Sequence, residues 1–225
     1  MATRLETIFF DVGNTLLFPD RDCILHPLIA LGHQPDLAQW QSIEREIKRQ
    51  FDDALQQGSP GDASFWQMFY DRLLLEFELR DPQVREALVK ATHQSANWRV
   101  IRPSTRTLLQ QLGQRYRLAV ISNADGRIED TLRHAGIADC FATIIDSGLV
   151  GYEKPHPAIF KAALDAMQAQ PAESLYVGDV YSVDYIGATR AGMQAILFDV
   201  AGAYRNSQVS RVESLEELSA RLQSL

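Results

Sequence analysis

The hydrophobic positions of the chain change their periodicity twice, and these changes divide it into three stretches. Residues 5–12 contain a short apolar run, Ile8-Phe9-Phe10, that is followed by Asp11, and they predict a buried strand. From about residue 18 to residue 98 the apolar positions recur every three or four residues with almost no β-branched runs, which predicts helices. Beyond residue 102 short apolar runs alternate with helical patterns, which predicts strands joined by helices.

The middle stretch predicts three helices. The first covers residues 36–57, with Asp36 as its N-cap and an apolar residue at every third or fourth position. The run Gly58-Ser59-Pro60-Gly61-Asp62 interrupts this pattern. A second helical pattern runs from Phe65 to Leu74, and Asp81-Pro82 opens a third. We therefore expect an all-helical insert at residues 18–98.

The third stretch predicts a parallel sheet, because alternating strands and helices bury a sheet on both faces. The expected strands lie at residues 117–122, 142–147, 174–178 and 194–198, and the expected helices at residues 126–134, 157–167, 182–191 and 213–222. The predicted fold is α/β: a Rossmann-like doubly wound parallel sheet formed by residues 1–17 and 99–225, with the helical domain inserted after the first strand.

Composition excludes several classes of protein. The 225 residues carry a net charge of −7, which argues against nucleic acid as a partner because binding to its phosphates depends on clustered lysine and arginine. No run approaches the roughly 20 apolar residues of a membrane span. The first hydrophobic run is only a strand long and the chain has two widely spaced cysteines, so we expect a cytoplasmic protein.

Polar side chains follow the predicted strands at the points where those strands end. Asp11, Ser122 and Asp179 each come directly after an apolar run. The carboxyl ends of parallel strands meet at one crevice, so we expect these groups to lie together. Carboxylate and carbonyl oxygens suit Mg²⁺, and Lys154, at the start of a predicted helix, can offset the charge of a phosphoryl group.

Each of these residues also has an ordinary interpretation when it is taken alone. An aspartate after a strand is commonly a turn former or a helix cap, and a single lysine is commonly a surface residue. The order in which they occur, each at a strand end or a helix start, favours a phosphoryl-transfer site instead.

Four segments together resemble the motifs of the haloacid dehalogenase-like hydrolase superfamily, and the resemblance covers nearly the whole chain. They are Asp11-Val12-Gly13-Asn14-Thr15, Ser122 after its strand, Gly151-Tyr152-Glu153-Lys154-Pro155-His156-Pro157, and Gly178-Asp179 followed by Asp184. The helical insert lies where this family places a cap domain. The resemblance implies a hydrolase of a small phosphorylated metabolite, with Mg²⁺ as cofactor.

The resemblance also assigns roles to individual residues. Asp11 is expected to be the nucleophile and a metal ligand, together with the backbone carbonyl of Gly13. Asp179 and Asp184 complete the protein's share of the Mg²⁺ ligands. The expected substrate contacts are Ser122, which binds the transferring phosphoryl group, and Asn123 beside it, while Lys154 neutralises Asp11 and the phosphoryl charge.

Gly13 departs from the family pattern. Phosphatases of the family carry an aspartate at this position, which protonates the leaving group and later activates water. Glycine does neither, and losing general acid–base catalysis typically costs about 10²–10⁴ in rate. The cost falls hardest on alkoxide leaving groups and least on aryl or acyl phosphates.

Three alternatives stay open at this point. Gly13 is compatible with a catalytically silent module that binds a phosphorylated ligand or another protein. A dehalogenase needs no metal, so the retention of Asp179 and Asp184 argues against it. A phosphonatase needs a cap lysine that forms an imine, and the candidates are Lys48 and Lys90. We expect Lys48, in Glu44-Arg45-Glu46-Ile47-Lys48-Arg49, on a solvated helix face with i,i+4 charge pairing. The sequence identifies neither the substrate nor the oligomeric state.

Overall fold

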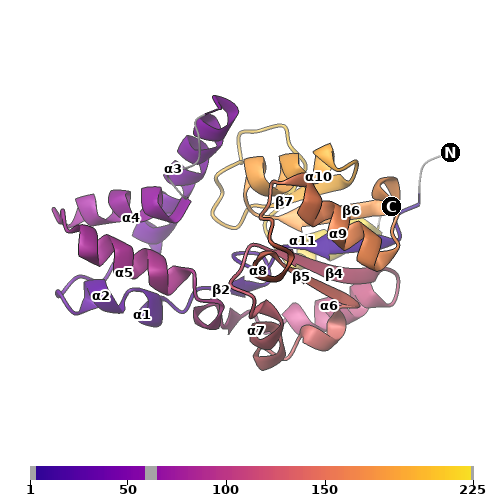
Figure 1. Cartoon of the computed structure of the whole chain (residues 1–225), viewed down its shortest axis with the longest axis horizontal. Coiled ribbons are helices and arrows are strands. Elements are labelled where there is room, and N and C mark those ends of the chain that lie inside the picture. The colour runs from indigo at the N-terminus through magenta and orange to yellow at the C-terminus, as the bar shows by residue number, and fades with distance from the viewer. Residues whose placement is uncertain (1–3, 59–64, 224–225) are drawn as a thin grey trace.

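The computed structural model describes residues 4–58 and 65–223, and the core of the molecule is a parallel sheet covered by helices (Figure 1). Its six strands follow the order β5-β4-β1-β6-β7-β8, and every neighbouring pair is parallel. The strands are β1 (Thr7–Phe10), β4 (Arg117–Ser122), β5 (Thr143–Asp146), β6 (Ser174–Gly178), β7 (Gln194–Phe198) and β8 (Arg211–Val212).

Alternate residues of the central strand fill two separate apolar cores, one on each face of the sheet. Ile8 and Phe10 belong to one core and Phe9 to the other, because successive side chains of a strand point to opposite faces. Helices α6 (Thr105–Gly113), α7 (Ile128–His134) and α11 (Leu215–Gln223) supply the first core, and α9 (Pro157–Met167) and α10 (Ile186–Arg190) supply the second. The doubly wound α/β fold is therefore confirmed.

The helices within residues 21–92 form a second body with an apolar core of its own, at the left of Figure 1. They are α1 (Arg21–Ile24), α2 (His26–Ile29), α3 (Leu37–Gln56), α4 (Phe65–Glu76) and α5 (Pro82–Thr92). Asp36 and Asp81 cap α3 and α5 as predicted, and Asp36 forms a capping box with Gln39. Residues 59–62 of the predicted break lie outside the described residues.

Two short strands join the helical body to the sheet, and the sequence did not predict them. Leu17–Phe18 (β2) pairs antiparallel with Val100–Ile101 (β3). Two residues are too few to show a periodicity. The pairing ties together the two segments that lead into and out of the helices, next to Trp98.

Other differences from the sequence prediction are local. The expected strand at 142–147 ends at Asp146, because that side chain accepts a hydrogen bond from the Gly148 amide and starts a short helix, α8 (Ser147–Val150). The expected helix at 182–191 begins as a π-helical turn, Tyr181–Tyr185 (η4), before α10. Among the described residues, no helix is long and apolar enough to cross a membrane.

Candidate active site

The predicted site residues meet in one cavity at the carboxyl ends of the three central strands. Asp11 follows β1, Ser122 ends β4 and Asp179 follows β6, and these strands are neighbours in the sheet. The cavity has a volume of about 490 Å³ and is lined by residues of both the sheet and the helical body. All seven predicted residues line it: Asp11, Gly13, Ser122, Asn123, Lys154, Asp179 and Asp184.

Three buried carboxylates form the centre of the site. Asp11, Asp179 and Asp184 each place an oxygen within 4.8 Å of the others. Like charges at such separations repel one another unless a cation lies between them. Since all three donors are hard oxygen ligands, the set fits Mg²⁺ by its chemistry and spacing.

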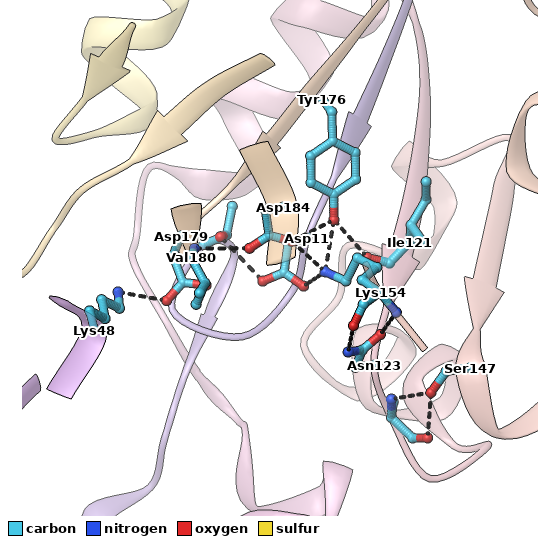
Figure 2. Close-up of polar contacts among 12 residues, drawn as sticks. Asp11, Lys48, Ile121, Asn123, Ser147, Lys154, Tyr176, Asp179, Val180 and Asp184 are labelled. Atoms are coloured by element: carbon cyan, nitrogen blue, oxygen red, sulfur yellow. Dashed lines mark hydrogen bonds and ion pairs between the residues drawn. The ribbon is translucent and has the colours of Figure 1, made fainter. Parts of the chain in front are cut away.

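Lys154 lies at the edge of this carboxylate cluster and is fully paired (Figure 2). Its Nζ is 2.6 Å from Asp11 Oδ1, 2.8 Å from Asp184 Oδ1 and 2.8 Å from the Tyr176 hydroxyl. An ammonium has three hydrogens, and these three partners use all of them. Its side chain is 3% exposed, so the ion pairs are shielded from water. The lysine is thus fixed next to the predicted nucleophile.

Burial changes the proton affinity of Asp11. Removal from water raises the pKa of its carboxyl to about 7, against the opposing effect of Lys154, and the charges of Asp184 and Asp179 raise it further. Burial likewise raises the pKa of Asp179. A cation at this site therefore competes with protons for these carboxylates.

Gly178 is needed because Asp184 occupies the space where its side chain would be. A Cβ added to Gly178 would lie 2.5 Å from the Asp184 carboxyl carbon, closer than non-bonded carbons approach. The Val180 amide donates to Asp184 Oδ2 at 2.9 Å, and this bond holds the carboxylate against the strand end. A glycine at position 178 thus leaves the room that the Asp184 carboxylate needs.

Asn123 lines the cavity and also binds the main chain of Lys154, which the sequence did not predict. Its side-chain amide donates to the Lys154 carbonyl at 3.0 Å, and its Oδ1 accepts from the Lys154 amide at 2.7 Å. Both ends of the Asn123 side chain are therefore engaged with the main chain of Lys154 (Figure 2). Its observed role is to position the lysine.

Two residues at the end of β5 hold the loop that follows Ser122, and sequence reasoning missed both. Ser147 Oγ accepts from the Ala124 amide at 3.0 Å and donates to the Ala124 carbonyl at 3.2 Å. Asp146 accepts from the amides of Gly126 and Ile128, both at 3.0 Å. Their only sequence signal is a polar pair directly after a strand.

Tyr176 is a further site residue that the sequence analysis did not identify. Its hydroxyl is bonded to Lys154, donates to the Ile121 carbonyl at 3.2 Å and lies 3.1 Å from Asp184 Oδ1. The side chain is completely buried within β6. A phenol in a strand that is buried on both faces needs a polar partner, and this was the signal available.

Lys48 is buried, so the prediction that it lies on a solvated helix face is wrong. Its side chain is 1% exposed, and its Nζ lies 2.8 Å from Asp179 Oδ2 and 2.9 Å from Glu44 Oε1 (Figure 2). Burial alone would lower the pKa of Lys48, but the two carboxylates outweigh it and raise the pKa well above that of a free lysine. The pairing with Glu44 was anticipated at i,i+4, whereas the burial was not.

Two further residues of helix α3 make polar contacts with the core. Asp52 accepts from the Ser182 amide at 2.9 Å and from the Tyr204 hydroxyl at 2.8 Å. The Arg45 guanidinium donates to the Ala201 carbonyl at 3.2 Å. Lys48 is thus held to Asp179 by a helix that is bonded to the core at neighbouring positions.

The chain matches a family of known proteins over most of its length. A family model described as haloacid dehalogenase-like hydrolase matches residues 5–192. Haloacid dehalogenase-like hydrolase domain-containing protein 3 of Bos taurus is 37% identical over 55% of this chain and 50% of its own length. The chain thus matches about half the length of that curated relative.

Two other comparisons cover more of the chain. A glyceraldehyde 3-phosphate phosphatase of Methanothermobacter thermautotrophicus is 31% identical over 86% of this chain and 85% of its own length. The magnesium-bound crystal structure of the HAD-hydrolase YfnB from Bacillus subtilis superposes with a TM-score of 0.71 over 97% of this chain and 99% of that one. At 19% identity this second likeness shows the fold.

Proposed function

Because the chain belongs to the haloacid dehalogenase-like hydrolase family, we propose that it is a Mg²⁺-dependent phosphatase that acts through an aspartyl phosphate on Asp11. The observation that carries this proposal is the convergence of three buried carboxylates on one point beside Lys154. The proposed substrate is a small phosphorylated metabolite, which the similarity to glyceraldehyde 3-phosphate phosphatases supports.

Each residue of the site would have a separate role in this reaction. Asp11, Asp179 and Asp184, with the Gly13 carbonyl, would hold Mg²⁺, which when bound neutralises charge on the phosphoryl oxygens. Asp11 supplies the attacking carboxylate oxygen. Lys154 holds Asp11 in place through a 2.6 Å ion pair, and the Ser122 hydroxyl donates to a phosphoryl oxygen.

Hydrolysis of an aryl phosphate tests this function. We expect turnover with Mg²⁺ and none with EDTA, measured by release of inorganic phosphate. Binding of Mg²⁺ without any turnover would favour the silent module. Release of halide from a haloacid without metal would favour a dehalogenase.

Lys48 is expected to oppose the binding of Mg²⁺, because its ammonium occupies Asp179. The Lys48→Met variant removes that competing charge and keeps a long apolar side chain. We expect it to bind Mg²⁺ about tenfold more tightly, as measured by isothermal titration calorimetry. Lys90→Met, on the exposed face of α5, is the matched control and should leave the affinity unchanged. Unchanged or weaker binding in Lys48→Met would show that this lysine does not compete with the cation.

The position of Lys48 is also the one observation that favours a phosphonatase. A cap lysine lies at the metal site, as that reaction needs. Its ammonium is paired with both Glu44 and Asp179, however, whereas imine formation needs an uncharged amine. Borohydride treatment in the presence of a phosphonoaldehyde distinguishes the two functions: a covalent adduct on Lys48 would support the phosphonatase, and its absence supports the phosphatase.

A further inference from the structure

The cavity that holds the carboxylates also has an aromatic wall, formed by Phe51, Phe65, Trp66 and Trp98. The four rings form a continuous series: Phe51 and Phe65 have centroids 5.7 Å apart, Phe65 and Trp66 4.9 Å, and Trp66 and Trp98 5.7 Å. All four side chains are only partly buried. The mechanism proposed above uses none of them.

Trp98 ends this series against Gly13. A Cβ added to Gly13 would lie 3.2 Å from Trp98 Cζ3, tighter than ordinary van der Waals contact, and 3.5 Å from Cε3. The indole is held in place, because its Nε1 donates to the Thr92 carbonyl at 2.7 Å. An aspartate at position 13 would therefore need the ring to shift by a few tenths of an ångström. An apolar ring thus borders the place of the missing acid.

The aromatic wall lies next to Gly13, which has no acid to protonate the leaving group. Without a proton donor the leaving group departs as an anion. A phenol, with a pKa of about 10, is far more acidic than water or an aliphatic alcohol, so a phenolate is a far better leaving group than an alkoxide or hydroxide. Aromatic rings also prefer other rings as edge-on or offset neighbours. The same wall that excludes the acid thus suits a substrate that does not need it.

We propose that the site is selective for aryl phosphates, whose ring contacts the aromatic wall next to Gly13; this proposal rests on the proposed function. In the reaction, an Asp11 oxygen forms a bond to phosphorus and the bond from phosphorus to the aryl oxygen breaks. The phenolate leaves with the electron pair and takes its proton from water. A second water then forms a bond to phosphorus as the bond from phosphorus to the Asp11 oxygen breaks, and the proton it loses neutralises the hydroxide left by the first water. No co-reactant besides water is needed.

Binding of two inert phosphonates tests the selectivity independently of turnover. Phenylphosphonate and cyclohexylphosphonate have the same charge and similar size. With Mg²⁺ present, we expect phenylphosphonate to bind at least about fivefold more tightly by calorimetry. Trp98→Leu should bring the two affinities to within about twofold, and Trp98→Phe should keep the preference. Phe77→Leu, a cap ring that does not line the cavity, is the matched control and should also keep it.

A double variant tests whether the ring excludes the acid. Gly13→Asp alone should give little gain in turnover of an alkyl phosphate, because the Trp98 ring crowds its Cβ at 3.2 Å. Gly13→Asp with Trp98→Ala should raise that turnover by about 10² or more. A comparable gain from Gly13→Asp alone, or no gain from the pair, would contradict the steric role of Trp98.

Together, phosphonate binding and ester turnover distinguish a failure of the aryl selectivity from a failure of the phosphatase function. Equal affinity for the two phosphonates, with Mg²⁺-dependent turnover of alkyl and aryl esters alike, would overturn the aryl selectivity and leave the phosphatase standing. A phenyl preference without turnover of any phosphate ester would support the aromatic binding site and overturn the phosphatase.

Discussion

The Asp11→Asn variant is expected to lose Mg²⁺-dependent hydrolysis of an aryl phosphate by on the order of 10⁴-fold or more. An amide oxygen is a poor nucleophile, and it is a weaker cation ligand than a carboxylate. The effect should appear in kcat, measured by phosphate release at saturating Mg²⁺. Folding should be preserved, because Lys154 keeps its ion pair with Asp184.

The control for this variant is Asp53→Asn, an exposed aspartate on α3. It makes the same chemical change away from the cavity and should retain wild-type turnover. If Asp11→Asn keeps more than about a tenth of the activity while it is folded, Asp11 is not the nucleophile.

Lys154→Met is expected to lower the free energy of unfolding by about 3–5 kcal/mol in the absence of metal. The substitution removes the ammonium that compensates Asp11 and Asp184, and both carboxylates are buried. Urea denaturation followed by circular dichroism measures the change. The loss should be smaller with Mg²⁺, because a bound cation would supply the missing positive charge.

Lys161→Met is the matched control for this measurement. Lys161 pairs with Asp165 one turn along α9, and its side chain is 74% exposed. Such surface pairs contribute about 1 kcal/mol or less. If Lys154→Met lowers the free energy of unfolding by no more than Lys161→Met does, the buried ion pairs do not stabilise the fold.

Much of the fold follows from local patterns in the sequence. Apolar runs located the strands, and capping residues such as Asp36 and Asp81 located helix starts, because these signals are contained within a few residues. Asp11, Ser122 and Asp179 could be grouped because they end strands that were expected to be parallel. The topology of the sheet then brings them together.

The contacts between distant segments could not be predicted in this way. Lys48 reads as one member of a helical charge pair, and only the docking of α3 on the core places it on Asp179. No local pattern shows that Asn123 binds the main chain of Lys154, which lies 31 positions further along the chain. Trp98 lies 85 positions from Gly13 in the sequence, and no local pattern links them.

Acid quenching during turnover of an aryl phosphate tests the central claim most directly. Since Gly13 lacks the carboxyl that would activate water, the aspartyl phosphate should break down slowly and accumulate. Peptide mapping by mass spectrometry should then find a phosphate adduct on Asp11, dependent on Mg²⁺ and absent from Asp11→Asn. An adduct on another residue, or steady turnover with Asp11 unmodified, would contradict the account.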